Sequence, residues 1–203
     1  TITFRGRAAH GSRYDIGIDV IRHAGFLLSE LDHLEEHVLA HITHPLLGHA
    51  SLHAGLIRGG TALTTYPDTC VLSIERRTLP GESPEDVQAQ IEGACSTVKA
   101  RHASLDATVT QDVYRPPSNV PVDAAIVRAL VDATETTGAR APIDGVSYWA
   151  DAALLNGAGI PTVCFGPGDI ALAHGAVEWI PVDEITRATD VLERFLTDWT
   201  RAS

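Results

Sequence analysis

Methionine is absent from all 203 residues of the chain, and the first residue is a threonine. Residues 1–5 have the alternating pattern of a strand and lack the basic and apolar segments of a signal peptide. Because a translated chain normally begins with methionine, we expect the sequence to be a piece of something longer.

Cysteine and positive charge are also scarce. The three cysteines, Cys70, Cys95 and Cys164, are odd in number and widely spaced, which argues against a disulfide framework or a zinc ribbon. We expect buried free thiols in a reducing cytoplasm. The 15 Lys and Arg residues against 26 Asp and Glu give a net charge of -11, so nucleic acid and anionic membrane surfaces are excluded as expected partners. No apolar run reaches the ~18 residues of a membrane span.

What is present is the composition of a folded globular protein, with 44% hydrophobic residues. Residues 1–116 show patterns of period two and period 3.6, which predict strand, helix, two strands, helix and strand. The strands are expected at residues 1–8, 51–57, 69–77 and 105–114, with a further extended segment at 61–65 and helices at 15–39 and 83–101. Ser83 is the expected N-cap of the second helix and Pro84 its first residue. This order predicts a ferredoxin-like βαββαβ sandwich.

A Pro-Pro-Ser-Asn segment at 116–119 marks a domain boundary. Beyond it, expected helices alternate with short apolar strands, as in a parallel or mixed α/β layer. The helices are expected at 123–137, 151–156 and 183–199, and the strands at 143–146 and 160–165. Strands buried on both faces need neighbours, so this sheet is incomplete. We therefore predict an α/β protein in which residues 1–116 form an α+β insertion and residues 117–203 form half of a mixed α/β domain.

Three places carry residues suited to chemistry. His10 follows the first strand in the stretch Gly6–Ser12, and Arg77 ends the strand that carries Glu75-Arg76-Arg77. Spacing alone favours solvated turn residues at both of these places. His174 follows an apolar run and the turn Gly166-Pro167-Gly168, where α/β sheets gather their sites. One histidine is not a metal site, because zinc requires three or four ligands.

Three histidines spaced by four, His33, His37 and His41, offer an alternative metal site on the first helix. They are interleaved with acidic residues and lie off the apolar stripe. We interpret them as a solvated helix face.

Taken in order, these segments resemble the acetylornithine deacetylase, succinyl-diaminopimelate desuccinylase and aminoacylase family of di-zinc metallohydrolases. The resemblance spans essentially the whole chain, and the ordered set of motifs is more specific than any one of them. The matching segments are Gly6–Ser12 with Gly17, Gly59-Gly60, Pro67-Asp68, Glu75–Arg77, Tyr148–Ala152, Gly159–Thr162, Phe165–Gly168 and His174–Glu178.

The resemblance implies a ferredoxin-like lid or dimerisation domain at residues 1–116 and the second half of a metal-dependent catalytic domain at residues 117–203. His10 resembles the lid histidine that reaches into the partner subunit and stabilises the oxyanion. Arg77 resembles the arginine that grips the substrate carboxylate. Thr64 stands where many members have a substrate-binding Asn. His174 resembles a zinc ligand, and Glu178 is expected to support it or the fold.

The resemblance further implies a zinc-dependent amidohydrolase or metallopeptidase. Its substrate would be an N-acyl amino acid or small peptide, and each complete site would hold two zinc ions, with cobalt or manganese as alternatives. Most metal ligands and the general base lie outside this segment, so we expect it to be inactive alone. We also expect a cytoplasmic homodimer formed through the lid domain. Two other hypotheses remain: a non-catalytic ferredoxin-like dimerisation or binding module, and a single-zinc enzyme built around His174.

Overall fold

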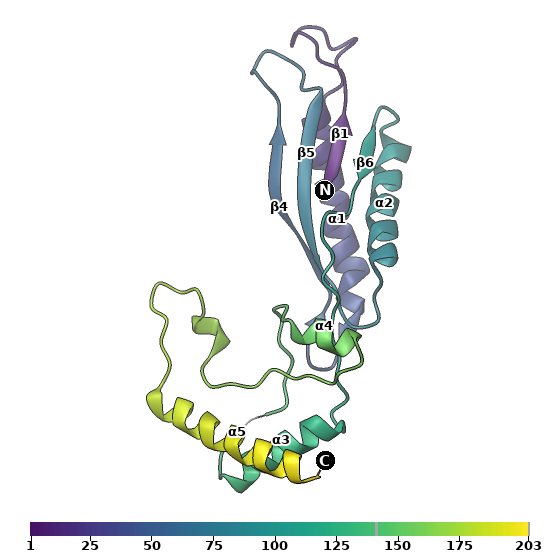
Figure 1. Ribbon diagram of the computed structural model, residues 1–203. Helices are drawn as coiled ribbons and strands as arrows, with labels where there is room; N and C mark the ends of the chain where they lie inside the picture. Colours follow the sequence, from purple (N-terminus) through teal and green to yellow (C-terminus); the bar gives the residue numbers. More distant parts are fainter. Residues whose placement is uncertain (141, 203) are drawn as a thin grey trace. The chain divides into compact units, whose positions relative to one another are not determined.

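The computed structural model describes residues 1–140 and 142–202, and the chain separates into two units, Thr1–Pro117 and Ser118–Ser203. The first unit contains an antiparallel sheet with the strand order β4-β5-β1-β6 (Figure 1). Its elements follow the predicted strand and helix order: β1 (Ile2–Arg5), α1 (Val20–His37), β4 (Ser51–Gly59), β5 (Thr69–Arg77), α2 (Pro84–Arg101) and β6 (Ala107–Val109). The short helix η1 (Leu39–His41) and the strands β2 (Thr43–His44) and β3 (Gly48–His49) lie between α1 and β4.

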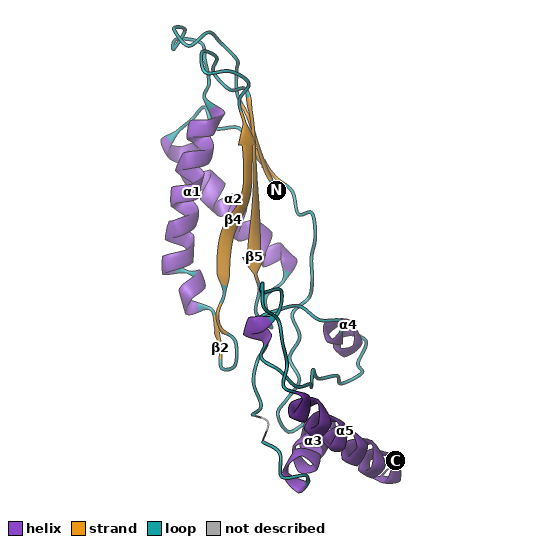
Figure 2. Cartoon of the chain, turned by 90° about the vertical axis from the view of Figure 1, so that its left-hand side faces the viewer, coloured by secondary structure: helices purple, strands orange, loops and turns teal. Residues whose placement is uncertain are grey.

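The core of this unit lies between the sheet and its two helices. Even-numbered residues of β1 and β5 point into it, and Phe4 and Leu72 are fully buried. The helices contribute Leu27 and Leu31 from α1 and Val98 from α2. Figure 2 shows α1 running along the sheet. The odd-numbered residues of β5, such as Glu75 and Arg77, are consequently carried on the opposite face.

Helix starts are set by local capping. The Ser83 hydroxyl accepts a hydrogen bond from the Asp86 amide, and the Asp86 carboxylate accepts one from the Ser83 amide, which confirms the predicted start of α2. Helix α1 begins later than predicted, at Val20, because the Asp19 carboxylate accepts from the Arg22 amide at 3.1 Å. Strand β6 is shorter than predicted, because β1 offers it only the partners Ile2–Phe4.

The second unit contains α3 (Ala125–Thr136), α4 (Ala152–Gly157), η2 (Ile170–Leu172) and α5 (Val182–Ala202). Helices α3 and α5 pack together, and Val191 of α5 is 1% exposed. The predicted strands at 143–146 and 160–165 are wrong: neither run forms a strand, and no strand lies in the described part of this unit. Instead, the Asn156 side chain holds the second run, donating to the Thr162 carbonyl at 2.8 Å and accepting from its amide at 2.7 Å.

Candidate functional site

Two loops meet at one end of the sheet in the first unit, and we call residues 6–19 and 60–68 together the loop end. The first loop follows β1 and the second joins β4 to β5, so the sheet order brings both to the same end (Figures 1 and 2). Backbone hydrogen bonds tie the loops together: the Gly11 amide donates to the Thr64 carbonyl at 2.6 Å, and the Tyr66 amide donates to the Ala9 carbonyl at 2.8 Å. The predicted extended segment at 61–65 is not a strand but part of this joined pair of loops.

Glycine is required where the loops approach most closely. A Cβ at Gly17 would lie 2.5 Å from Cγ of Tyr66, so the aromatic ring covers a position that only glycine can occupy without displacing it. A Cβ at Gly6 would lie 2.5 Å from the Ile18 carbonyl oxygen. These close contacts provide a physical reason for glycine at positions 6 and 17, on either side of His10.

Hydrogen bonds hold both the backbone and the imidazole ring of His10 at the loop end. Its backbone forms a bridge with Thr65, and its carbonyl accepts from the Arg13 amide at 2.7 Å. The ring nitrogen Nδ1 lies 2.9 Å from Oγ of Ser12 and 3.3 Å from the Ser12 amide nitrogen. The side chain itself is exposed. The residues predicted from the sequence did not include Ser12, because its contact with His10 depends on the turn geometry that the spacing alone does not reveal.

Thr64 lies beside His10, since its carbonyl accepts the amide of Gly11, the next residue. Its side chain is exposed. The structure therefore brings together His10 and Thr64, two of the four predicted site residues.

Arg77 lies at the opposite end of the sheet. It is the last residue of β5 and pairs with Ser51, whereas the loop end adjoins Thr69, the first residue of that strand. Arg77 lies eight residue steps along β5 from Thr69, which is about 26 Å at roughly 3.3 Å per step. Arg77 contacts Glu75 at 2.6 Å, and both side chains are about half exposed. Within one copy of this unit, His10 and Arg77 do not share a site.

The neighbouring Arg76 has a structural role that the sequence did not reveal. It points to the core side of β5 and forms an ion pair with Glu82; the two side chains are only 4% and 9% exposed. Glu82 also accepts from the Leu79 amide at 2.7 Å. Of the two adjacent arginines, Arg77 is therefore the one exposed to solvent.

His174 lies in the second unit, two residues after the end of η2, and its side chain is exposed. Its φ of 61° places a non-glycine residue in the left-handed region, which is often associated with functional sites. The His174 amide donates to the Glu178 carboxylate at 3.3 Å, so Glu178 stabilises this turn.

The described residues do not form a metal site. No group of three or more His, Cys, Asp or Glu side chains among them is placed to hold an ion, and His174 with Glu178 would supply at most two ligands. His33 and His37 stack at 4.0 Å, with Nδ1 of His37 bonded to the His33 carbonyl, which agrees with a helix surface. Likewise, no helix in residues 1–140 and 142–202 is long and apolar enough to cross a membrane.

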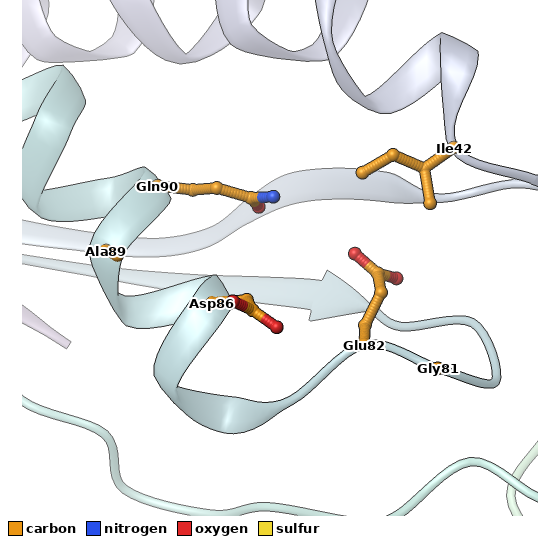
Figure 3. Close-up of a pocket in the computed structure, with 6 residues that line it drawn as sticks. All are labelled: Ile42, Gly81, Glu82, Asp86, Ala89 and Gln90. Atoms are coloured by element: carbon orange, nitrogen blue, oxygen red, sulfur yellow. The ribbon is translucent and has the colours of Figure 1, made fainter.

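A shallow hollow lies elsewhere in the first unit, where η1 approaches the start of α2 (Figure 3). Its carboxylates already serve the fold, because Glu82 holds Arg76 and Asp86 completes the capping box of α2. The hollow is lined by Ile42, Gly81, Glu82, Asp86, Ala89 and Gln90. We assign it a structural role.

Comparison with known proteins identifies the family of the domain that contains the loop end and its sheet. The model of the peptidase dimerisation domain of M20 enzymes matches residues 1–103. An acetylornithine deacetylase from Myxococcus xanthus is 30% identical over 198 residues, covering 95% of this chain and 50% of that protein. The chain thus spans about half the length of the curated relatives it matches.

Solved structures share the fold at lower identity. A tripeptidase from Staphylococcus aureus superposes with a TM-score of 0.78 and 20% identity, over 98% of this chain and 50% of that one. An M20 family metallo-carboxypeptidase from Sulfolobus solfataricus gives a TM-score of 0.64 and 13% identity, over 96% of this chain and 57% of that one. The chain therefore belongs to the M20 peptidase family of metal-dependent hydrolases and contains that family's dimerisation domain.

Proposed function

We propose that this chain is the dimerisation domain and part of the catalytic domain of a metal-dependent hydrolase that cleaves the amide bond of an N-acyl amino acid or small peptide. The observation that carries the proposal is the similarity to an acetylornithine deacetylase, which covers 95% of this chain. The relatives' names supply the substrate class. The proposed enzyme works in the cytoplasm, with residues 1–116 as lid and 117–203 as part of the catalytic domain.

In this proposal, His10 donates a hydrogen bond to the oxyanion of the tetrahedral intermediate. Its exposure at the tip of a well-bonded loop end suits a residue that acts outside its own unit. A preorganised donor of this kind stabilises the transition state because negative charge develops on the substrate oxygen. Thr64, next to His10, is proposed to contact the same substrate.

Arg77, whose side chain is 45% exposed, is proposed to bind the substrate carboxylate through its guanidinium group. Since about 26 Å of β5 separates it from the loop end, the two residues of one copy would serve different sites. This separation supports a shared arrangement, in which His10 acts in the partner's site.

His174 is proposed as one ligand of a zinc site that takes its other ligands from outside the described residues. The dimer is proposed to form through β4, the edge strand, whose outer side has no neighbouring strand among the described residues. Leu56 and Ile57 on this strand are 58% and 50% exposed, so pairing with a second copy would bury apolar surface.

The test is a mixture of two variants of the zinc-loaded hydrolase, His10→Ala and His174→Ala. Alone, His10→Ala should keep its metal and lose turnover by about 10²–10³-fold, and His174→Ala should lose metal and activity together. If His10 acts across the dimer, a random mixture should recover roughly a quarter of the wild-type activity, since half of the dimers are mixed and each has one intact site. A mixture as inactive as its components would refute action across the dimer.

A non-catalytic dimerisation module is the second candidate, favoured by the lack of a metal-binding group among the described residues. The His10→Ala and His174→Ala variants of the hydrolase separate the two functions, because both candidates predict the same result for the 203-residue chain assayed alone with Zn²⁺ and N-acetylated amino acids. We expect the chain alone to be inactive and to bind no stoichiometric zinc. If His10→Ala and His174→Ala leave the hydrolase fully active, the module function is favoured.

A further inference from the structure

The ring of His10 is held by one residue, Ser12, through two contacts on the same nitrogen. Nδ1 lies 3.3 Å from the Ser12 amide nitrogen and 2.9 Å from its hydroxyl oxygen. The other ring nitrogen, Nε2, has no hydrogen-bond partner among residues 1–140 and 142–202. Nε2 is therefore the ring nitrogen of His10 that is available to bind a ligand at the loop end.

The two contacts on Nδ1 differ in what they require of the ring. A hydroxyl can donate or accept, so Oγ of Ser12 is compatible with either tautomer of a neutral imidazole. A backbone N–H can only donate, so the Ser12 amide requires Nδ1 to be the unprotonated, accepting nitrogen. The proton of the neutral ring then sits on Nε2.

We propose that Ser12 is a positioning residue that fixes His10 in the Nε2–H tautomer and thereby makes its outward nitrogen a hydrogen-bond donor. This inference rests on the proposed function for its purpose, because an oxyanion needs a donor and the opposite tautomer would present a lone pair to it. The amide of Ser12 selects the tautomer, and its hydroxyl limits rotation of the ring. The preference exists in the neutral histidine.

Three other histidines of the chain serve as internal controls, because the contacts of their Nδ1 atoms predict their tautomers. Nδ1 of His44 lies 3.2 Å from the Leu46 amide nitrogen, a backbone donor two residues on, as in His10. Nδ1 of His37 and of His49 lie 3.0 Å and 2.8 Å from carbonyl oxygens, which can only accept. His44 should therefore share the Nε2–H tautomer, whereas His37 and His49 should carry the proton on Nδ1.

The experiment is long-range ¹H–¹⁵N correlation NMR of the ¹⁵N-labelled 203-residue chain at pH about 8.5, where histidine side chains as a class are neutral. The spectrum distinguishes protonated from unprotonated ring nitrogens, and His10→Gln identifies the His10 signals. We expect an unprotonated Nδ1 and a protonated Nε2 in His10 and His44, with the reverse in His37 and His49. A protonated Nδ1 in His10 would overturn the proposal.

Two variants distinguish the contribution of the Ser12 amide from that of the Ser12 hydroxyl. Ser12→Ala keeps the amide and should keep the tautomer. Ser12→Pro removes the amide and should lower the ratio of Nε2–H to Nδ1–H about five-fold, the factor that one ordinary hydrogen bond provides. An unchanged ratio in Ser12→Pro, in a sample whose circular dichroism is that of the wild type, refutes the role of Ser12, as does loss of the preference in Ser12→Ala. The wild-type spectrum decides the tautomer even if the proline variant does not fold.

This readout is independent of catalysis. If His10 is the Nε2–H tautomer but His10→Ala keeps full turnover in the hydrolase, the proposed function fails and the positioning by Ser12 stands. If turnover falls and Nδ1 is protonated, the function stands and the positioning by Ser12 fails.

Discussion

Replacing Glu82 with glutamine should destabilise the first unit strongly, because it leaves the charge of Arg76 buried without its counterion. The two side chains are 4% and 9% exposed, and Glu82 also accepts from the Leu79 amide. Removing one partner of a buried ion pair costs about 3–5 kcal/mol, mostly the penalty of the uncompensated charge. A glutamine of the same size can still accept a hydrogen bond, so the loss is assigned to charge.

The size of this effect can be judged against the whole unit. At about 0.05–0.15 kcal/mol per residue, a unit of this length is stable by roughly 6–18 kcal/mol. The substitution therefore removes a large share of the stability. Replacing both partners, as Arg76→Met with Glu82→Leu, should recover much of it, because neither charge then remains buried.

Hydrogen exchange of the amides of α2 during urea titration measures this loss where it occurs. The matched control is Glu75→Gln, whose pair with Arg77 is about half exposed and should contribute at most ~1 kcal/mol. All three tryptophans, Trp149, Trp179 and Trp199, lie in the second unit, so their fluorescence follows that unit separately. The reasoning fails if Glu82→Gln costs no more than Glu75→Gln, or if the double variant is no more stable than Glu82→Gln alone.

Three further predictions concern other parts of the chain. Gly17→Ala should place a methyl group against the Tyr66 ring, lower the unfolding free energy by about 1–3 kcal/mol and speed hydrogen exchange of the Gly11 amide. In the control Gly25→Ala, the added Cβ meets open space on α1, so the substitution should be neutral or stabilising. Equal effects of the two substitutions would contradict the packing argument. Burial, followed by the nearby charge of His102, lowers the pKa of His23, so the unfolded chain binds the proton more readily than the folded chain. The unfolding free energy should therefore fall as the pH drops below about 6.5. Denaturation of His23→Leu should show a smaller decrease of the unfolding free energy over the same pH range. Leu56→Lys with Ile57→Lys should convert a dimer to monomers in sedimentation experiments, and an unchanged dimer would place the interface elsewhere than β4.

The sequence predicted elements whose signals are local. Strand β5 has its predicted bounds, Thr69–Arg77, because its alternation is long and a proline-glycine turn follows it. The start of α2 was predictable from Ser83 and Pro84, since capping depends on residues within one turn.

The errors arose where structure depends on distant partners. The apolar runs at 143–146 and 160–165 resemble buried strands, yet a strand requires a neighbouring strand, and the described part of the second unit supplies none. Periodicity cannot reveal whether such a partner is present.

The candidate site shows the same division. His10 was located by its motif, but its contact with Ser12 depends on the turn geometry of the loop end. Arg76 and Arg77 were indistinguishable by type, and only the strand's alternation with the position of Glu82 separates the buried arginine from the accessible one. The roles of His10, Thr64, Arg77 and His174 in catalysis and binding stay predictions.

The two edges of the sheet differ in length, and this difference limits how far copies of the chain can add to one another. Strand β4 has nine residues, whereas β6 at the other edge has three. Pairing of two β4 strands about a two-fold axis uses the long edge of both copies and leaves only the short edges outside. If the subunits pair in this proposed way, growth would stop at two copies, and the contact that joins the subunits would also protect the sheet from forming a fibre.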